Sequence, residues 1–231
     1  MAKARDILAL GLVLATGTVA AQVQCISTVD SHGDRALVEQ GDFRASVNWQ
    51  NTSLQPTTIG YGSAARRAYE LTVDQGRVFM VRPKGEGFEV RHDPRPDEGA
   101  VMLQLASPSK WQPVTQLDEI STFDDLAFLL DELLEEIDCG EDAVLPFRIE
   151  GHIQAATWSL DTRPVNHVGH AGPQQAAIVG IYSRHDKKRL FMVPGYNLHA
   201  HIVLKGDGFA GHLRDLQLTE GAILYLPAQR D

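Results

Sequence analysis

Near its C-terminus the chain reads Gly195-Tyr196-Asn197-Leu198-His199-Ala200-His201-Ile202-Val203-Leu204, then Lys205-Gly206-Asp207-Gly208-Phe209-Ala210-Gly211-His212. The β-branched and apolar residues after His201 predict a strand. Side chains alternate along a strand, so His199 and His201 should lie on the same face. The glycine-rich segment 205–208 predicts a turn, after which the returning chain places His212 beside the pair. The sequence therefore predicts a β-hairpin on which three imidazoles converge.

Three converging imidazoles indicate a metal site. Catalytic zinc is usually held by three protein ligands that leave one coordination position open, whereas structural zinc has four. We therefore expect His199, His201 and His212 to bind Zn²⁺, although nickel, iron or copper accept the same ligands. His167 and His170 lie in a turn-rich segment, and we expect them to stay outside the metal site.

The turn of this hairpin also matches a nucleotide-binding pattern. Residues 206–211 read G-x-G-x-x-G, but a dinucleotide site needs a helix to begin there. Residues 213–218 alternate apolar and polar side chains instead, which is typical of a strand. The match is interpreted as a hairpin turn. The sequence contains neither G-x-S-x-G nor a phosphate-binding Walker loop.

Short strands separated by turn residues are predicted on both sides of one helix. The expected strands are 68–73, 77–81, 88–90, 101–105, 146–156, 176–182, 190–193 and 222–226. Asp74-Gln75-Gly76 should connect the first two as a hairpin, and the Thr-, Ser-, Pro- and Gly-rich segment 51–62 should be a loop.

The helix is expected at 122–138. Ser121 or Thr122 would cap it, acidic residues occupy its first turn, and Gly140 follows its end. Leucines at helical spacing form one apolar face, so this helix should pack against the core.

These patterns predict an α+β protein of two β-rich subdomains, mostly antiparallel sheet or barrel, with one prominent amphipathic helix between them. We expect an N-terminal mixed β-sheet subdomain at 22–143, which includes the helix. An antiparallel β subdomain at 144–231 should carry the metal site.

Residues 1–21 are typical of a secretory signal peptide. Lys3 and Arg5 precede an apolar run from Ile7 to Ala15 that is too short to span a membrane, and small residues precede Gln22. We therefore expect a periplasmic or secreted protein, with no membrane association after signal removal. In an oxidising compartment Cys25 and Cys139 either form a disulfide or remain apart.

The chain is acidic. Its formal net charge is −9, which becomes −10 without residues 1–21. An acidic surface argues against nucleic acid as a partner. The sequence leaves the oligomeric state open, a homodimer included.

Glu70 is a charged residue within the strand-like run 68–73. Such a glutamate either lies on the solvent face of its strand or, beside a metal, moves protons. The residues alone leave both interpretations open.

Four segments together resemble a known family. Gln40-Gly41-Asp42-Phe43 is similar to an early H-G-D-F motif, and residues 69–76 are similar to a G-E-M-I…D-G stretch. Phe147-Arg148-Ile149-Glu150-Gly151 is similar to an I-R-x-D-G strand. Pro194-Gly195-Tyr196, with the H-x-H pair and Gly211-His212, is similar to a zinc signature. In this order and spacing the chain resembles the α-acetolactate decarboxylase family.

The resemblance implies two linked β-rich domains with zinc held by His199, His201 and His212, and with Glu70 as the catalytic carboxylate. It implies decarboxylation of 2-acetolactate, a small 2-hydroxy-3-oxo acid, to acetoin, and so a role in acetoin biosynthesis. Zinc would act as a Lewis acid that stabilises an enediolate, and a carboxylate would assist proton delivery.

Three positions differ from the family pattern. Asn197 follows Gly195-Tyr196 where the family has its first ligand, so the histidine pair is displaced by two residues. The family's catalytic arginine falls on Ser159 without gaps, with Arg148 and Arg163 as candidates to replace it. The family's further catalytic glutamate lies in a longer C-terminal tail.

Two alternative functions therefore remain. One is a non-catalytic exported metal-binding relative of the family, which the missing arginine and glutamate favour. The other is a metal-dependent, cupin-like β-barrel enzyme. Against the second, Lys205 and Gly206 stand where a cupin usually has a glutamate.

Overall fold

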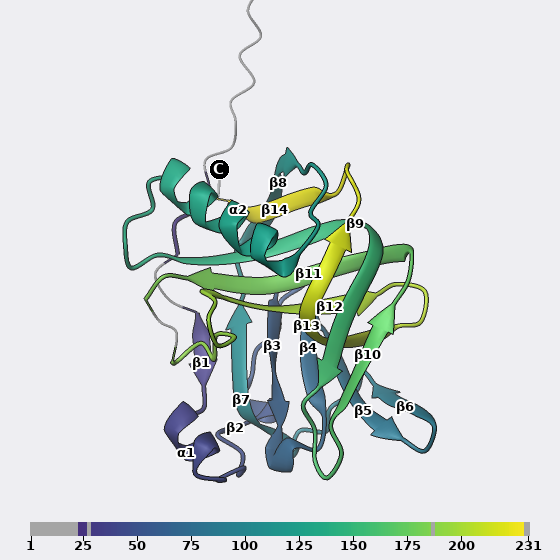
Figure 1. Ribbon diagram of the computed structural model, residues 1–231. Coiled ribbons are helices and arrows are strands. Elements are labelled where there is room, and N and C mark those ends of the chain that lie inside the picture. The colour runs from purple at the N-terminus through teal and green to yellow at the C-terminus, as the bar shows by residue number, and fades with distance from the viewer. Residues whose placement is uncertain (1–22, 27–28, 186–187, 229–231) are drawn as a thin grey trace, which may run out of the picture.

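Two antiparallel β-sheets make up most of the protein, as the computed structural model of residues 23–26, 29–185 and 188–228 describes (Figure 1). The first sheet has the order β1-β7-β3-β4-β5-β6, with β2 paired to β7. Its strands are β1 (Asp30–His32), β2 (Val47–Asn48), β3 (Ile59–Ala64), β4 (Glu70–Asp74), β5 (Arg77–Lys84), β6 (Gly87–Arg91) and β7 (Gly99–Ala106). Three short helices, α1 (Arg35–Glu39), η1 (Trp49–Asn51) and η2 (Ala65–Arg67), connect them.

The second sheet closes into a small barrel. Its strands are β8 (Lys110–Gln116), β9 (Val144–Leu160), β10 (His167–Ala171), β11 (Gln174–Ser183), β12 (Leu198–Leu204), β13 (Phe209–Leu218) and β14 (Ile223–Ala228). The 17-residue strand β9 pairs with β11 along its first part and with β13 along its last part. Because β12 joins β11 to β13, these four strands form a closed ring.

One main helix, α2 (Phe123–Glu136), lies over the second sheet (Figure 1). The Thr122 hydroxyl accepts a hydrogen bond from the Asp125 amide, and Asp124 and Asp125 lie in the first turn, where the helix dipole favours anions. The buried side chains of Phe123, Leu126, Leu130 and Leu134 attach α2 to the core. The predicted fold class, with its capped amphipathic helix, is confirmed.

Two predicted turns have backbone conformations that match their sequences. Gln75 and Gly76 have positive φ values of 50° and 75°, which are typical of a tight hairpin turn. This turn joins β4 to β5, which pair as the sequence predicted. Residues 205–208 form the turn between β12 and β13, and no helix follows. The dinucleotide interpretation is therefore excluded by structure as well as by sequence.

Three predictions of where strands and loops lie were wrong. Residues 59–62 belong to β3 rather than to a loop, because β3 passes so close to β7 that only glycine fits: a Cβ on Gly60 would lie 2.2 Å from the Gln104 carbonyl oxygen. Residues 190–193 form no strand, since 190–191 end a turn and 192–193 have no regular structure. His167 and His170 lie in strand β10 rather than in a loop.

The first sheet packs against the barrel, mainly through contacts of β3, β4 and β5 with β11 and β13. Strand β8 and helix α2 belong with the second sheet, so the chain changes sheet between Ala106 and Lys110. The subdomain boundary near residue 143 stays a prediction, because the structure does not divide the chain into units that test it.

The N-terminal segment is joined to both sheets. Cys25 forms a disulfide with Cys139, which follows α2. Val23 and Ile26 bridge to Ala228 and Val144 of the second sheet, before β1 joins the first. The predicted signal peptide lies outside the described residues. Within the described ranges, no helix has the length and apolar character needed to cross a membrane.

Candidate metal centre

The predicted histidine hairpin is present as β12 and β13. His201 and His212 are direct cross-strand partners, and His199 lies two residues before His201 on the same face of β12. This face is turned toward the first sheet, since His201 contacts Thr72 and His199 stacks on Tyr61. The hairpin therefore places all three imidazoles in the interface between the sheets.

The three imidazoles are buried and converge on one point. Their relative exposures are 3%, 0% and 6% for His199, His201 and His212, and one ligand atom from each lies within 4.8 Å of the others. The Nε2 atoms of His199 and His201 are 3.3 Å apart. Two nitrogens at the zinc–nitrogen distance of about 2.0–2.1 Å, at a tetrahedral angle, would be separated by about 3.3–3.4 Å. This cluster could hold a metal ion.

Each Nδ1 atom already has a hydrogen-bond partner. His199 Nδ1 donates to the Phe191 carbonyl (2.7 Å), and His212 Nδ1 donates to the Asp161 carboxylate (3.1 Å). His201 Nδ1 pairs with the Thr72 hydroxyl at 2.7 Å. Donation through Nδ1 leaves the Nε2 lone pair free for a metal. His212 Nε2 is buried without a partner, which is the condition of a ligand atom.

Burial keeps the imidazoles in the form that binds metal. It lowers the pKa of His199 and His201 well below the usual range, and the other imidazoles lower it further. Burial also lowers the pKa of His212, although its hydrogen bond to Asp161 opposes this. Neutral imidazoles at neutral pH need not release a proton before a metal binds.

Glu70 approaches the same point from the first sheet. It is the first residue of β4 and is 2% exposed, with Oε1 3.6 Å from His201 Nε2. Its other oxygen accepts a hydrogen bond from the Asp161 amide (2.9 Å). Burial, with repulsion from Asp161, raises the pKa of Glu70 to about 8, while Arg67 and Arg214 oppose the rise. A bound dication would favour the charged form.

Asp161 and Arg214 form the outer side of the cluster. The Arg214 guanidinium donates to Asp161 Oδ2 (2.6 Å) and to the Ser159 hydroxyl (2.8 Å). Burial acts to raise the pKa of Asp161, but His212 and Arg214 lower it overall. Glu70, Asp161 and His212 also lie close enough to hold a cation, but the Arg214 charge already neutralises Asp161. The side chains of Asp161 and Arg214 are 30% and 33% exposed, so solvent approaches the cluster from this side.

Two neighbours fix His199. The Tyr61 ring stacks on the imidazole at 3.9 Å between centroids, and its hydroxyl donates to the Leu190 carbonyl. Phe191, which supplies the carbonyl to His199 Nδ1, has φ 54°. A bulky residue rarely adopts this left-handed conformation, and such conformations persist mainly where the surroundings demand them.

The other residues singled out from the sequence lie elsewhere. His170 Nδ1 pairs with the Thr157 hydroxyl, and His167 contacts the Trp158 and Phe88 rings, so neither joins the three histidines. The Arg148 guanidinium donates to Asp74 and Glu150. Arg163 lies over the Phe43 ring, 4.4 Å from its centroid.

Three residues around the histidines were not among the predicted site residues. Arg214 could have been found by the same alternation that found the pair, because it lies two residues after His212 on β13. Thr72 lies two residues after Glu70 on β4 in the same way. Asp161 carried no such signal, since the pairing of β9 with β13 brings it to His212.

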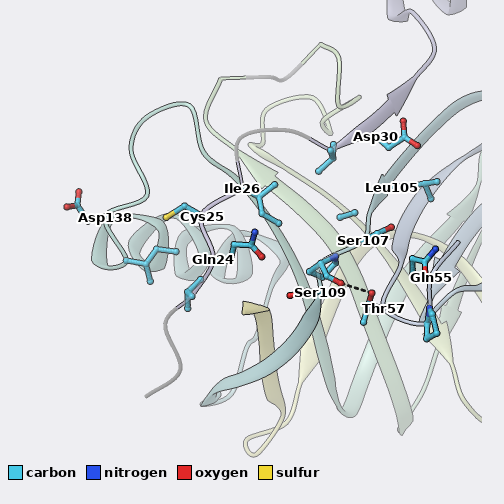
Figure 2. Close-up of a pocket in the computed structure, with 16 residues that line it drawn as sticks. Gln24, Cys25, Ile26, Asp30, Gln55, Thr57, Leu105, Ser107, Ser109 and Asp138 are labelled. Carbon is cyan, nitrogen blue, oxygen red and sulfur yellow. Dashed lines mark hydrogen bonds between the residues drawn. The ribbon is translucent and has the colours of Figure 1, made fainter. Parts of the chain in front are cut away.

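A large groove lies away from this cluster. It has a volume of about 1570 Å³ between residues 23–26 and 29–30, residues 105–109 and the end of α2, and its lining includes none of the three histidines. Figure 2 shows its labelled side chains, among them Gln24, Asp30, Gln55 and Ser107, with a hydrogen bond from Thr57 to the Pro108 carbonyl in its wall. The residues around it form no metal-ligand set within the described chain.

No protein-family model matches the sequence, and no curated protein sequence matches it at a significant level. Solved structures do match. Acetolactate decarboxylase from Bacillus subtilis subspecies spizizenii has a TM-score of 0.67 at 13% identity, over 87% of this chain and 86% of that chain. Alpha-acetolactate decarboxylase from Bacillus subtilis strain 168 has 0.66 at 14% identity, over 88% and 86%.

A Staphylococcus aureus protein of unknown function, described as similar to alpha-acetolactate decarboxylase, has a TM-score of 0.64 at 14% identity, over 86% of this chain and 84% of that chain. At such identities the similarity is one of architecture. The chain has the fold of the alpha-acetolactate decarboxylase structures, with a buried cluster of three histidines that could bind a metal.

Proposed function

We propose that this protein binds zinc through His199, His201 and His212 and decarboxylates 2-acetolactate to acetoin and carbon dioxide. The observation that carries the proposal is the buried convergence of the three imidazoles, with 3.3 Å between two Nε2 atoms, inside this fold. The similarity to two acetolactate decarboxylase structures supports the choice of reaction. It also favours this reaction over that of a cupin-like enzyme.

The donor set fits zinc. Three neutral nitrogens suit zinc and leave a position open for a substrate. Zinc bound there would supply a Lewis acid. The protein's own part is to hold each ring by its Nδ1 atom and to exclude water, which the Tyr61 stack and the Thr72 hydroxyl support.

We assign proton delivery to Glu70. Decarboxylation breaks the bond between the carboxyl carbon and its neighbour, carbon dioxide leaves, and the electron pair stays on the substrate. A proton must then reach that carbon, and Glu70 Oε1 lies 3.6 Å from His201 Nε2, beside the histidines. Its second oxygen is fixed by the Asp161 amide, so the donor has a defined orientation. Glu70 regains its proton from solvent.

A second candidate is metal binding without turnover. Arg148, one of two arginines considered as the family's catalytic arginine, is 3% exposed and its guanidinium is held by Asp74 and Glu150. Arg148 is therefore not free to contact a substrate, and a site without its help could bind a metal and not turn over substrate. This is the specific observation that favours the second candidate.

We also propose that the protein is exported. The disulfide between Cys25 and Cys139 supports an oxidising compartment, where such bonds persist. The signal-peptide pattern at 1–21 points the same way. A periplasmic or secreted protein with this centre would meet its substrate outside the cytoplasm.

The test combines metal content with product formation. We expect about one zinc per mature chain and acetoin from racemic 2-acetolactate. His201→Ala should lose both, whereas His170→Ala, which changes a histidine outside the centre, should keep both. Glu70→Gln should keep zinc and form acetoin about 10²-fold more slowly or worse. Stoichiometric zinc without acetoin in the wild type would overturn the decarboxylase and leave the second candidate.

A further inference from the structure

Two arginines beside the metal centre lack an ion pair among the described residues, although the charge of one of them, Arg67, acts on Glu70. Arg67 and Arg163 form no ion pair within the described residues, although the chain carries 30 acidic and 21 basic side chains. Most other arginines of these ranges do, as Arg44 does with Asp42 and Arg214 with Asp161. In a protein with an excess of acid, unpaired guanidinium groups at one place point to an anion from outside.

Both guanidinium groups lie on one aromatic ring. The Cζ atom of Arg163 is 4.4 Å and that of Arg67 is 5.8 Å from the centroid of Phe43. Stacking on a ring holds an arginine in place while its N–H groups stay available to an acceptor. Phe43 thus keeps two cations close together, where they would otherwise repel each other.

Backbone hydrogen bonds join the three segments that carry these residues. The Arg163 amide donates to the Arg67 carbonyl (2.8 Å), and the Arg66 amide donates to the Phe43 carbonyl (2.7 Å). Arg66 and Arg67 have φ values of 61° and 55°, which bulky residues rarely adopt. Strained conformations of this kind collect at ligand sites.

The same segments lead directly into the metal centre. Arg67 lies three residues before Glu70, and Arg163 lies two residues after Asp161, whose amide binds Glu70. Two of the carboxylates nearby are occupied, Asp42 by Arg44 and Asp161 by His212 and Arg214, whereas Glu70, on whose charge Arg67 acts, has one oxygen held by the Asp161 amide. Arg163 is exposed and Arg67 half-buried, so solvent reaches both, as it reaches Asp161 and Arg214 on the outer side of the centre.

We propose that Arg67 and Arg163, held on Phe43, form an anion-binding clamp at the entrance of the histidine centre, and that this clamp selects small organic carboxylates over neutral molecules of the same shape. The inference rests on the proposed function only in taking the anion to be the carboxylate of the substrate. Guanidinium groups suit this task because their planar N–H fork matches a carboxylate.

The test compares a charged with an uncharged probe. We choose 2-hydroxyisobutyrate, which has the hydroxy-acid end of the proposed substrate but cannot lose carbon dioxide through a keto group, and its neutral amide. Their dissociation constants would be measured by calorimetry on zinc-loaded protein. The wild type should bind the acid about tenfold tighter than the amide or better, the effect of one charge-assisted hydrogen bond.

Arg67→Gln and Arg163→Gln should each weaken acid binding by about tenfold and leave amide binding and zinc content unchanged. Arg77→Gln is the matched control. It is another arginine without an ion pair in the described part of the chain, stacked on Phe79 at the far end of the β4–β5 hairpin, and acid binding should not change.

Equal affinity for acid and amide in the wild type, no binding of the acid, or unchanged acid affinity in both variants would overturn the clamp. None of these results depends on acetoin formation. If the clamp variants lose acid affinity but the wild type makes no acetoin, the proposed reaction fails and the clamp stands.

Discussion

Two polar clusters occupy the interface between the sheets, and they differ in how completely their side chains are paired. The histidine cluster brings three imidazoles against Thr72 and Glu70 of the first sheet. The arginine cluster, defined as Arg148, Asp74, Glu150 and Lys205, joins β9 and the turn after β12 to the end of β4. Both lie close to the core, and both link elements far apart in the sequence.

The arginine cluster is complete in itself. Arg148 Nε and Nη2 donate to Asp74 at 2.7 and 3.2 Å, and Nη2 also donates to Glu150 at 2.8 Å. None of its buried side-chain nitrogens or oxygens lacks a partner among the described residues, whereas His212 Nε2 in the histidine cluster does. Buried polar atoms are normally satisfied, so a structural cluster and a ligand site are told apart by what remains unpaired.

The largest expected effect is on metal binding. His212→Gln removes one imidazole while keeping much of its volume, and zinc affinity should fall by about 10³-fold because one of three ligands is lost. The free energy of unfolding of the metal-free protein should change by about 1 kcal/mol or less. Metal titration and denaturant unfolding measure the two effects. Retained zinc affinity would place the metal elsewhere.

Arg148→Ala should lower the stability of the protein and leave zinc binding unchanged, the opposite of His212→Gln. It leaves Asp74 buried without its partner, so the free energy of unfolding should fall by about 3–5 kcal/mol, while zinc content stays the same. Adding Asp74→Leu to the variant should recover part of the loss, because the uncompensated charge is then gone. A loss of zinc in a folded Arg148→Ala protein would contradict the division into two clusters.

Thr72→Val removes the hydroxyl that holds His201 Nδ1, and zinc affinity should drop by about 10–100-fold. Thr72→Ser keeps the hydroxyl and should restore most of the affinity. The comparison of the Val and Ser variants separates the effect of orienting His201 on zinc affinity from the effect of changed packing. Equal affinities in the two variants would show that the hydroxyl does not orient His201.

The smallest effect concerns acid stability. The hydrogen bond from Arg148 lowers the pKa of Glu150 to about 2, although burial opposes this, and Lys205 lowers it further. The unfolded chain, with a pKa near 4.5, takes up the proton first. The stability from Glu150 is therefore complete above about pH 4.5 and is lost as the pH falls toward 2.

Unfolding free energies of the wild type and Glu150→Gln, measured between about pH 3 and 6, should converge as the pH falls. The effect should be modest because Glu150 is 33% exposed. A constant difference across this range would mean that Glu150 contributes nothing through its charge.

The sequence predicted those parts that depend on local periodicity. The alternation around His199 and His201 and the glycine-rich turn were enough to place His212 opposite His201. The capped leucine face predicted α2 for the same reason. Neither inference needed a contact between distant segments beyond one hairpin.

The features that the sequence left open depend on how the two sheets pack against each other. Glu70 could lie on the solvent face or on the core face, and only the packing of β4 against the barrel buries it. Asp161 reaches His212 because β9 is long enough to pair with both β11 and β13, whereas the sequence predicted strand only to residue 156. Pairing of Cys25 with Cys139, left open by the sequence, follows from the same long-range geometry.

The most direct test of the metal centre is a crystal structure of the zinc-loaded protein with anomalous data collected on both sides of the zinc absorption edge. We expect one anomalous peak at about 2.0–2.1 Å from the Nε2 atoms of His199, His201 and His212, with each Nδ1 still bound to its protein partner. A peak at other residues, coordination through Nδ1, or no peak at these histidines would contradict the account.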